Sequence, residues 1–343
     1  MAGVTAPILP YGPLIGEGRA LDWGPPPPRV ALSEAALRLD AMRVSTVILP
    51  VDRWADGGRE LWQRAEELGF HAAYTYDHLS WRSFRDGPWF GAVPTLTAAA
   101  AATSRLRLGT LVTSPNFRHP VTLAKELISL DDISGGRITL GIGAGGSGFD
   151  ATALLRGAEE AWTPRERADR FGEFTELLDR LLTHDVVSHE GEHYSAREVR
   201  NIPGCVQRPR LPFAVAATGP RGMRLAARFG QAWVTTGDPK LFETGTPADS
   251  LAAIGRQVER LGKACADAGR ADEPDKVLLT GFTPDGTRPL SSVDAFVDFA
   301  GEHARLGIDE IVLHWPIADS VFEADPGVFE KIATEGAERV AAL

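Results

Sequence analysis

Short apolar runs alternate with helical segments eight times between residue 44 and the end of the 343-residue chain. The first run, VSTVILP (44–50), is rich in β-branched residues. Runs that are apolar throughout, rather than at every second position, are typical of strands covered on both faces. Strict alternation with helices favours a parallel sheet, and eight units favour an α/β fold of the closed (β/α)8 TIM-barrel type. The expected strands are 44–50, 71–76, 105–112, 137–143, 212–218, 231–236, 276–282 and 309–316, and the expected helices are 58–68, 94–103, 120–132, 164–183, 220–229, 247–268, 291–306 and 327–341.

An open, doubly wound sheet is the alternative that the same alternation allows. Such sheets commonly carry a GxGxxG phosphate-binding turn after the first strand. Here the first strand continues as LPVDRWADGG (49–58), which lacks that turn. The sequence therefore favours the barrel over the open sheet.

Residues 1–43 lie outside this pattern and are expected to form an N-terminal arm, so that the barrel domain spans 44–343. The arm contains several glycines and the run Pro25–Pro28, and proline fixes φ and removes a hydrogen-bond donor. We therefore expect an extended segment. Apolar side chains such as Trp23 favour an arm that lies over the core or a partner chain, and a loosely attached tail is the alternative.

A second departure from the pattern is the stretch 184–210 before the fifth strand, which is too long for an ordinary helix-to-strand loop. It contains SHEGEHYS (188–195), and we expect an insertion hairpin with VVS and HYS as its arms. The histidines His184, His189 and His193 do not have the spacing of a metal-binding set, so we expect no metal site.

Composition restricts the class of function. The formal net charge of −10 argues against nonspecific nucleic-acid binding and favours a protein that acts on small molecules. The only cysteines, Cys205 and Cys265, form no CxxC motif, which suits a reducing cytoplasm. The N-terminus lacks the features of a signal peptide, and no run is apolar enough to span a membrane, so we expect a cytoplasmic protein.

Barrel enzymes assemble their sites from the C-terminal ends of strands and the loops that follow. The second strand ends in TYDHLSW (75–81), which brings a carboxylate, an imidazole and an indole to that position. Many aromatic residues lie near strand ends, and they either hold a flat conjugated ligand or pack the rim. These aromatic residues are Trp54, Tyr76, Trp81, Phe84, Trp89, Phe90 and Trp315.

Two glycine-containing loops are candidates for ligand contact. AATGPRGMRLAARFG (216–230) places Thr218 and Gly219 before a helix that starts at Pro220, and free N–H groups at a helix start favour a phosphate. GIGAGGSGFD (141–150) follows the fourth strand and either approaches a ligand or is mobile.

Four segments resemble the bacterial luciferase-like flavin-dependent oxidoreductases. The long block RHPVTLAKELISLDDISGGRITLGIGAG (118–145) is the most specific, and LGTLVTSPNFRHP (108–120), YDHLSW (76–81) and AATGPRGMRLAARFGQAWVTTG (216–237) follow the same pattern. The resemblance covers about residues 44–320. It implies a TIM-barrel enzyme that binds coenzyme F420 or FMN, commonly as a homodimer, with a bulge and a non-proline cis peptide near Leu111–Val112.

The resemblance also distinguishes the cofactors. Asp77, His78 and Trp81 look like the trio of the F420-dependent branch, whereas the Glu-His-His type sequence of the luciferase branch is absent. F420 is therefore favoured over FMN. The chain departs from the sugar-phosphate dehydrogenases of that branch. Gly145, Gly146 and Ser147 stand where those enzymes carry a glutamate that acts as an acid, so neither that substrate nor the acid role is carried over.

The expected site combines these arguments. The catalytic candidates are His78 as general acid or base, Asp77 and His314. The cofactor-binding candidates are Asp77, Val112, Thr113, Ser114, Gly143, Ala144, Gly145, Thr218, Gly219, Arg221 and Gly222. The substrate-pocket candidates are Trp81, Trp89, Phe149 and Trp315.

Three functions remain open at this point. The first is hydride transfer between F420 and a small organic substrate. The second is an FMNH2-dependent monooxygenase that uses O2 and a separate flavin reductase. The third is a barrel that stores or senses flavin without turnover.

Overall fold

The computed structural model describes residues 41–146, 162–282 and 288–342. Nearly all of the expected N-terminal arm (1–43) lies outside these residues, so the division of the chain at residue 44 stays a prediction. Neither cysteine forms a disulfide within the described residues, and both are buried. Of the helices described, none combines the length and the apolar character needed to cross a bilayer.

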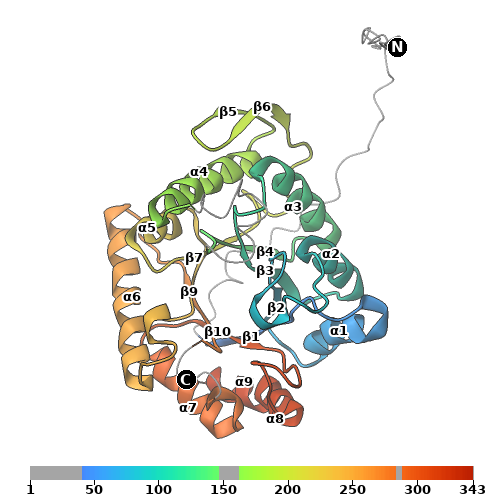
Figure 1. Cartoon of the computed structure of the whole chain (residues 1–343), viewed down its shortest axis with the longest axis vertical. Helices are drawn as coiled ribbons and strands as arrows, with labels where there is room; N and C mark the ends of the chain where they lie inside the picture. Colours follow the sequence, from blue (N-terminus) through green and yellow to red (C-terminus); the bar gives the residue numbers. More distant parts are fainter. Residues whose placement is uncertain (1–40, 147–161, 283–287, 343) are drawn as a thin grey trace, which may run out of the picture. The chain divides into compact units, whose positions relative to one another are not determined.

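Eight parallel strands close into a barrel in the order β1-β10-β9-β8-β7-β4-β3-β2, which confirms the TIM-barrel prediction. Helices surround the barrel, as Figure 1 shows. The strands are β1 (Arg43–Val47), β2 (Ala72–Thr75), β3 (Arg107–Thr113), β4 (Ile138–Gly143), β7 (Phe213–Ala216), β8 (Ala232–Thr235), β9 (Asp275–Leu279) and β10 (Glu310–His314). The helices after them are α1 (Arg59–Glu67), α2 (Ala92–Ala102), α3 (Pro120–Ser134), α4 (Pro164–Thr183), α5 (Pro220–Phe229), α6 (Pro247–Asp267), α7 (Val293–Ala304), α8 (Pro326–Lys331) and α9 (Ala337–Val340).

Local capping explains why several helices begin where the sequence predicts. Thr163 and Glu166 form a capping box at the start of α4, and Thr246 and Asp249 form another at the start of α6. Each box is followed by proline at the first helical position, where its missing N–H costs nothing. The expected last helix, 327–341, instead consists of α8, a π-helical turn (Ile332–Gly336) and α9.

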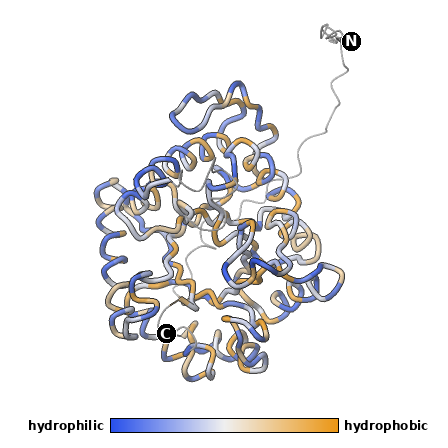
Figure 2. Tube along the Cα trace, viewed as in Figure 1, coloured by the Kyte–Doolittle hydropathy of each residue, from blue (hydrophilic) through white to orange (hydrophobic). Residues whose placement is uncertain are grey.

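Apolar side chains form two layers on either side of the strands. Inside the barrel, Val47, Leu111, Val234 and Val312 belong to one buried cluster. Larger clusters lie between the strands and the surrounding helices. In Figure 2 the outer helices alternate between hydrophilic and hydrophobic positions along the tube, as expected when one face of each is buried.

The insertion before the fifth barrel strand is a hairpin, as predicted, made of β5 (Val186–Glu190) and antiparallel β6 (Ser195–Arg200). The second arm begins at Ser195 rather than at His193. The reason is that Glu173 on α4 accepts hydrogen bonds from the backbone N–H groups of His193 (2.9 Å) and Tyr194 (2.8 Å), which holds them in the turn. Within the described ranges, no group of three metal-ligating side chains occurs.

One carboxylate joins α1 to the start of β3. Glu66 accepts hydrogen bonds from the backbone N–H groups of Ser104 (2.9 Å), Arg105 (2.6 Å) and Leu106 (2.8 Å). Burial alone would raise the pKa of Glu66, but these bonds outweigh it and lower the pKa to about 2. The ionised carboxylate therefore stabilises the fold fully above its ordinary pKa of 4.5 and less as the pH falls toward 2.

A Glu66→Gln variant tests this contribution. The amide keeps only one acceptor oxygen, so we expect a lower free energy of unfolding than in the unmodified protein near neutral pH. We expect the difference to narrow as the pH falls from about 4.5 toward about 2, where the native carboxylate becomes protonated. Urea unfolding of both proteins across that range measures the difference, and a gap that does not change with pH would contradict the assignment.

Candidate active site

The C-terminal ends of β2 and β10 bring three predicted side chains together around Tyr76. The Tyr76 hydroxyl lies 2.7 Å from Nε2 of His314, although 238 residues separate the two in sequence. The rings of His78 and Trp81 lie 5.8 and 5.5 Å from the Tyr76 ring, both edge-on. The structure therefore places His78, Trp81 and His314 in one cluster, at the mouth where barrels carry chemistry.

His314 is buried and electrically neutral at physiological pH. Burial lowers its pKa to about 3, against a smaller opposing effect of the Thr280 backbone. Its ring stacks on Phe322 at 3.8 Å between centroids. Burial also raises the pKa of Tyr76, so both members of the pair stay uncharged. The pair can hold a proton in a hydrogen bond, but His314 does not supply a charged acid.

Asp77 is turned away from this cluster. Its side chain is buried and receives hydrogen bonds from Nη2 (2.7 Å) and Nε (3.0 Å) of Arg118 and from the Thr113 hydroxyl (2.9 Å). Burial alone would lower the pKa of Arg118, but the bonds to Asp77 outweigh it and raise that pKa. Asp77 thus ties the end of β2 to the end of β3 instead of orienting the imidazole of His78.

Arg118 was not among the residues expected at the site. It is the first residue of the block 118–145, and nothing in its local sequence shows that it reaches Asp77, 41 residues earlier. The available signal was an arginine shortly after the end of the third strand, next to the strand that ends in Asp77.

The ends of β3 and β4 form a wall next to Asp77. The register of β3 against β4 shifts between Thr110 and Thr113, and the Leu111–Val112 peptide is cis, which confirms the expected bulge. A Cβ added to Gly143 would lie 3.0 Å from Cγ2 of Val112, so glycine leaves room for the bulge.

The cofactor-binding candidates of these two strands therefore lie side by side. Asn116 fixes the loop after β4, because its amide donates to the Gly146 carbonyl at 2.8 Å and accepts from Arg170 at 2.8 Å. A Cβ at Gly145, where φ is +73°, would meet that Asn116 amide at 2.7 Å. The predicted residues gathered here are Val112, Thr113, Ser114, Gly143, Ala144 and Gly145.

The start of α5 presents backbone donors without a side-chain cap. Thr218 and Gly219 are exposed, and a Cβ at Gly219 would meet nothing within 4 Å, so the turn is open. At Gly222 a Cβ would lie 2.7 Å from Cβ of Ala217, which explains the glycine by packing. Arg221 faces α4 instead, where Nη1 bonds to Asp169 at 2.6 Å.

The four substrate-pocket candidates have different outcomes. Trp81 lies at the mouth and stacks on Phe322, with the ring centroids 5.6 Å apart. The indole of Trp89 donates to the His78 carbonyl at 2.8 Å. Trp315 packs outside the barrel against Phe329. Successive residues of a strand point to opposite faces, and the preceding residue, His314, points inward. The prediction for Trp315 is therefore wrong, and Phe149 lies outside the described residues.

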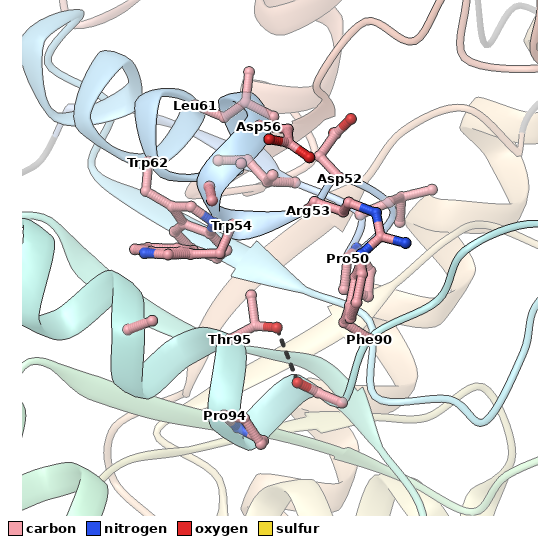
Figure 3. Close-up of a pocket in the computed structure, with 16 residues that line it drawn as sticks. Pro50, Asp52, Arg53, Trp54, Asp56, Leu61, Trp62, Phe90, Pro94 and Thr95 are labelled. Carbon is pink, nitrogen blue, oxygen red and sulfur yellow. Dashed lines mark hydrogen bonds between the residues drawn. The ribbon is translucent and has the colours of Figure 1, made fainter.

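A side cavity of about 450 Å³ lies next to this mouth, between the end of β1 and the start of α2. Trp54, Trp62, Phe90 and Pro94 form its walls, and Figure 3 shows Asp52 and Asp56 on one side of it. None of the predicted catalytic or cofactor-binding residues lines it. Trp54 and Phe90, two of the aromatic residues expected near strand ends, thus line this cavity rather than the mouth.

The chain is similar in sequence to known oxidoreductases. Residues 42–284 match the family described as luciferase-like monooxygenase. The F420-dependent glucose-6-phosphate dehydrogenase of Beutenbergia cavernae is 32% identical over 265 residues, which is 75% of this chain and 74% of that protein. The 4-hydroxyprotoasukamycin monooxygenase of Streptomyces nodosus subsp. asukaensis is 35% identical over 265 residues, which is 73% of this chain and 67% of that protein.

A solved structure agrees with the fold. The coenzyme F420-dependent tetrahydromethanopterin reductase from Methanopyrus kandleri superposes with a TM-score of 0.67 at 21% identity. The match covers 86% of this chain and 98% of that one. At this identity the likeness concerns the barrel architecture alone.

Proposed function

The chain belongs to the luciferase-like monooxygenase family, and we propose that it is an oxidoreductase that transfers a hydride between coenzyme F420 and a small organic substrate. The observation that carries this proposal is the cluster of His78, Tyr76 and His314 at the barrel mouth. The identity to an F420-dependent dehydrogenase supports the choice of cofactor. We further propose that the protein is cytoplasmic and that it forms a homodimer, and light scattering on the purified protein tests the dimer.

The residues present fit a flat ring that carries a phosphate tail. The bulge at Leu111–Val112 and the missing Cβ of Gly143 leave a smooth wall for a ring. The uncapped N–H groups at the start of α5, next to the open turn at Gly219, favour an anion through the partial positive charge of the helix end. Arg221 would have to exchange Asp169 for the phosphate to contribute there.

The protein groups divide the remaining work. F420, when bound, supplies the hydride chemistry. His78 holds or moves the proton that accompanies the hydride, because an imidazole ring can both donate and accept a proton and this one lies half-buried at the mouth. Asp77 and Arg118 position the ends of β2 and β3, and Trp81 with Phe322 excludes water from one side of the mouth.

The alternative is an FMNH2-dependent monooxygenase that uses O2. The 35% identity to a monooxygenase favours it. In that case FMNH2, when bound, would supply the chemistry with O2, the residues of the mouth would exclude water, and a separate flavin reductase would be the partner.

Titration with both cofactors separates the two functions. We expect purified protein to bind F420 more tightly than FMN, measured by the fluorescence of the deazaflavin and by absorbance. We also expect stopped-flow mixing of the protein with FMNH2 and O2 to show no long-lived oxygen adduct. Tighter binding of FMN together with such an adduct would contradict the F420 proposal and support the monooxygenase.

A further inference from the structure

Arg82 holds a cation over the aromatic wall of the mouth. It begins the short 3-10 helix Arg82–Phe84, and its φ of +39° lies in the left-handed region that side-chain-bearing residues rarely adopt. Its guanidinium carbon lies 5.1 Å from the ring centroid of Trp81 and 5.6 Å from that of Phe282. Unfavourable backbone conformations of this kind cluster at functional sites, where the surrounding structure holds them in place.

The charge of Arg82 has no carboxylate partner within residues 41–146, 162–282 and 288–342. In this it differs from Arg118 and Arg221, which pair with Asp77 and Asp169 at 2.7 and 2.6 Å. The charge also reaches the buried pair, because Arg82 opposes the burial effect on the pKa of Tyr76. Among the described residues, the mouth thus presents a cation without a carboxylate partner next to its reactive groups.

Resting on the proposed function, we propose that Arg82 binds a carboxylate of the substrate, and that the substrate is a flat, unsaturated or aromatic carboxylic acid. The guanidinium fork matches a carboxylate with two parallel hydrogen bonds. The partly exposed Phe282 supplies apolar surface for the body of such a molecule, and the buried, stacked rings of Trp81 and Phe322 support it from below. Arg82 would then select the substrate by charge, whereas His78 handles the proton.

Benzoate and its neutral analogue benzamide test the assignment without knowledge of the natural substrate. We expect calorimetric titration to show benzoate binding to the unmodified protein, with benzamide much weaker. An Arg82→Gln variant should lose about 10- to 100-fold in benzoate affinity, the range expected for hydrogen bonds to a charged group. Arg82→Lys should keep part of the affinity, and Arg165→Gln, an exposed arginine on α4, should keep all of it.

Four outcomes would overturn the proposal: no benzoate binding, equal binding of benzamide, unchanged benzoate affinity in Arg82→Gln, or a loss in that variant of F420 affinity alone. The last outcome would assign the cation to the cofactor. The proposed function fails separately, when the protein binds neither F420 nor FMN while the benzoate results stand. Because Arg82 is exposed, thermal unfolding of Arg82→Gln should match that of the unmodified protein, which separates lost binding from lost folding.

Discussion

Turnover in a His78→Ala variant is expected to fall by roughly two to four orders of magnitude, the usual contribution of a positioned acid or base. His78 is half-buried at the mouth and its ring lies 5.8 Å from that of Tyr76. The other histidine of the cluster, His314, cannot replace it as a charged acid because burial lowers its pKa to about 3. Single-turnover kinetics with F420 and a substrate measure the loss.

The affinity for F420 should change little in the same variant, because the wall formed by β3 and β4 and the start of α5 remain intact. His184→Ala is the matched control, since His184 is exposed at the end of α4, and it should keep full turnover. Unimpaired turnover in His78→Ala would contradict the assignment of proton transfer to His78. Tight F420 binding without turnover in the unmodified protein would instead support a storage or sensing role.

An Arg118→Met variant is expected to lower the free energy of unfolding by about 3–5 kcal/mol, the range seen when one partner of a buried ion pair is removed. The Asp77 side chain is 2% exposed, and Arg118 supplies two of its hydrogen bonds. Without the guanidinium, the carboxylate keeps the Thr113 hydroxyl and must otherwise remain a buried charge or take up a proton. Urea unfolding at neutral pH measures the change.

The matched control is an arginine in an exposed pair. Arg228 lies 2.7 Å from Glu176, and both side chains are largely open to solvent. Arg228→Met should therefore change the free energy of unfolding by no more than about 1 kcal/mol. Adding Asp77→Asn to Arg118→Met should recover part of the loss, because the buried charge is removed. Equal stability of Arg118→Met and Arg228→Met would contradict the role given to the Asp77–Arg118 pair.

Local sequence was enough for the elements and their order. The apolar runs and the helical segments predicted every barrel strand, with ends that differ from the structure by no more than three residues. They predicted helices α4 and α5 at the bounds that the structure has. The reason is that capping residues, proline at the first helical position and the apolar pattern act within a few residues of one another. The family resemblance added the cis peptide at Leu111–Val112, which composition and periodicity could not indicate.

Side-chain direction at the strand ends needed the closed barrel. The strand pattern places His314 and Trp315 on opposite faces, but only barrel closure decides that His314 points inward and Trp315 meets Phe329 outside. Barrel closure also decides the directions of Asp77 and His78. The side chain of Asp77 points toward Arg118, and the side chain of His78 points toward Tyr76.

The sequence by itself thus determined the fold class, the order of the elements and the end of the barrel that carries the site, since each depends on short-range pattern. Only the tertiary structure decided which side chains meet there. Tyr76 and His314 are 238 residues apart, Asp77 and Arg118 are 41 apart, and Arg82 is a cation without a partner in the described chain. These pairings depend on strand register and stagger around the barrel, which no local stretch of sequence encodes.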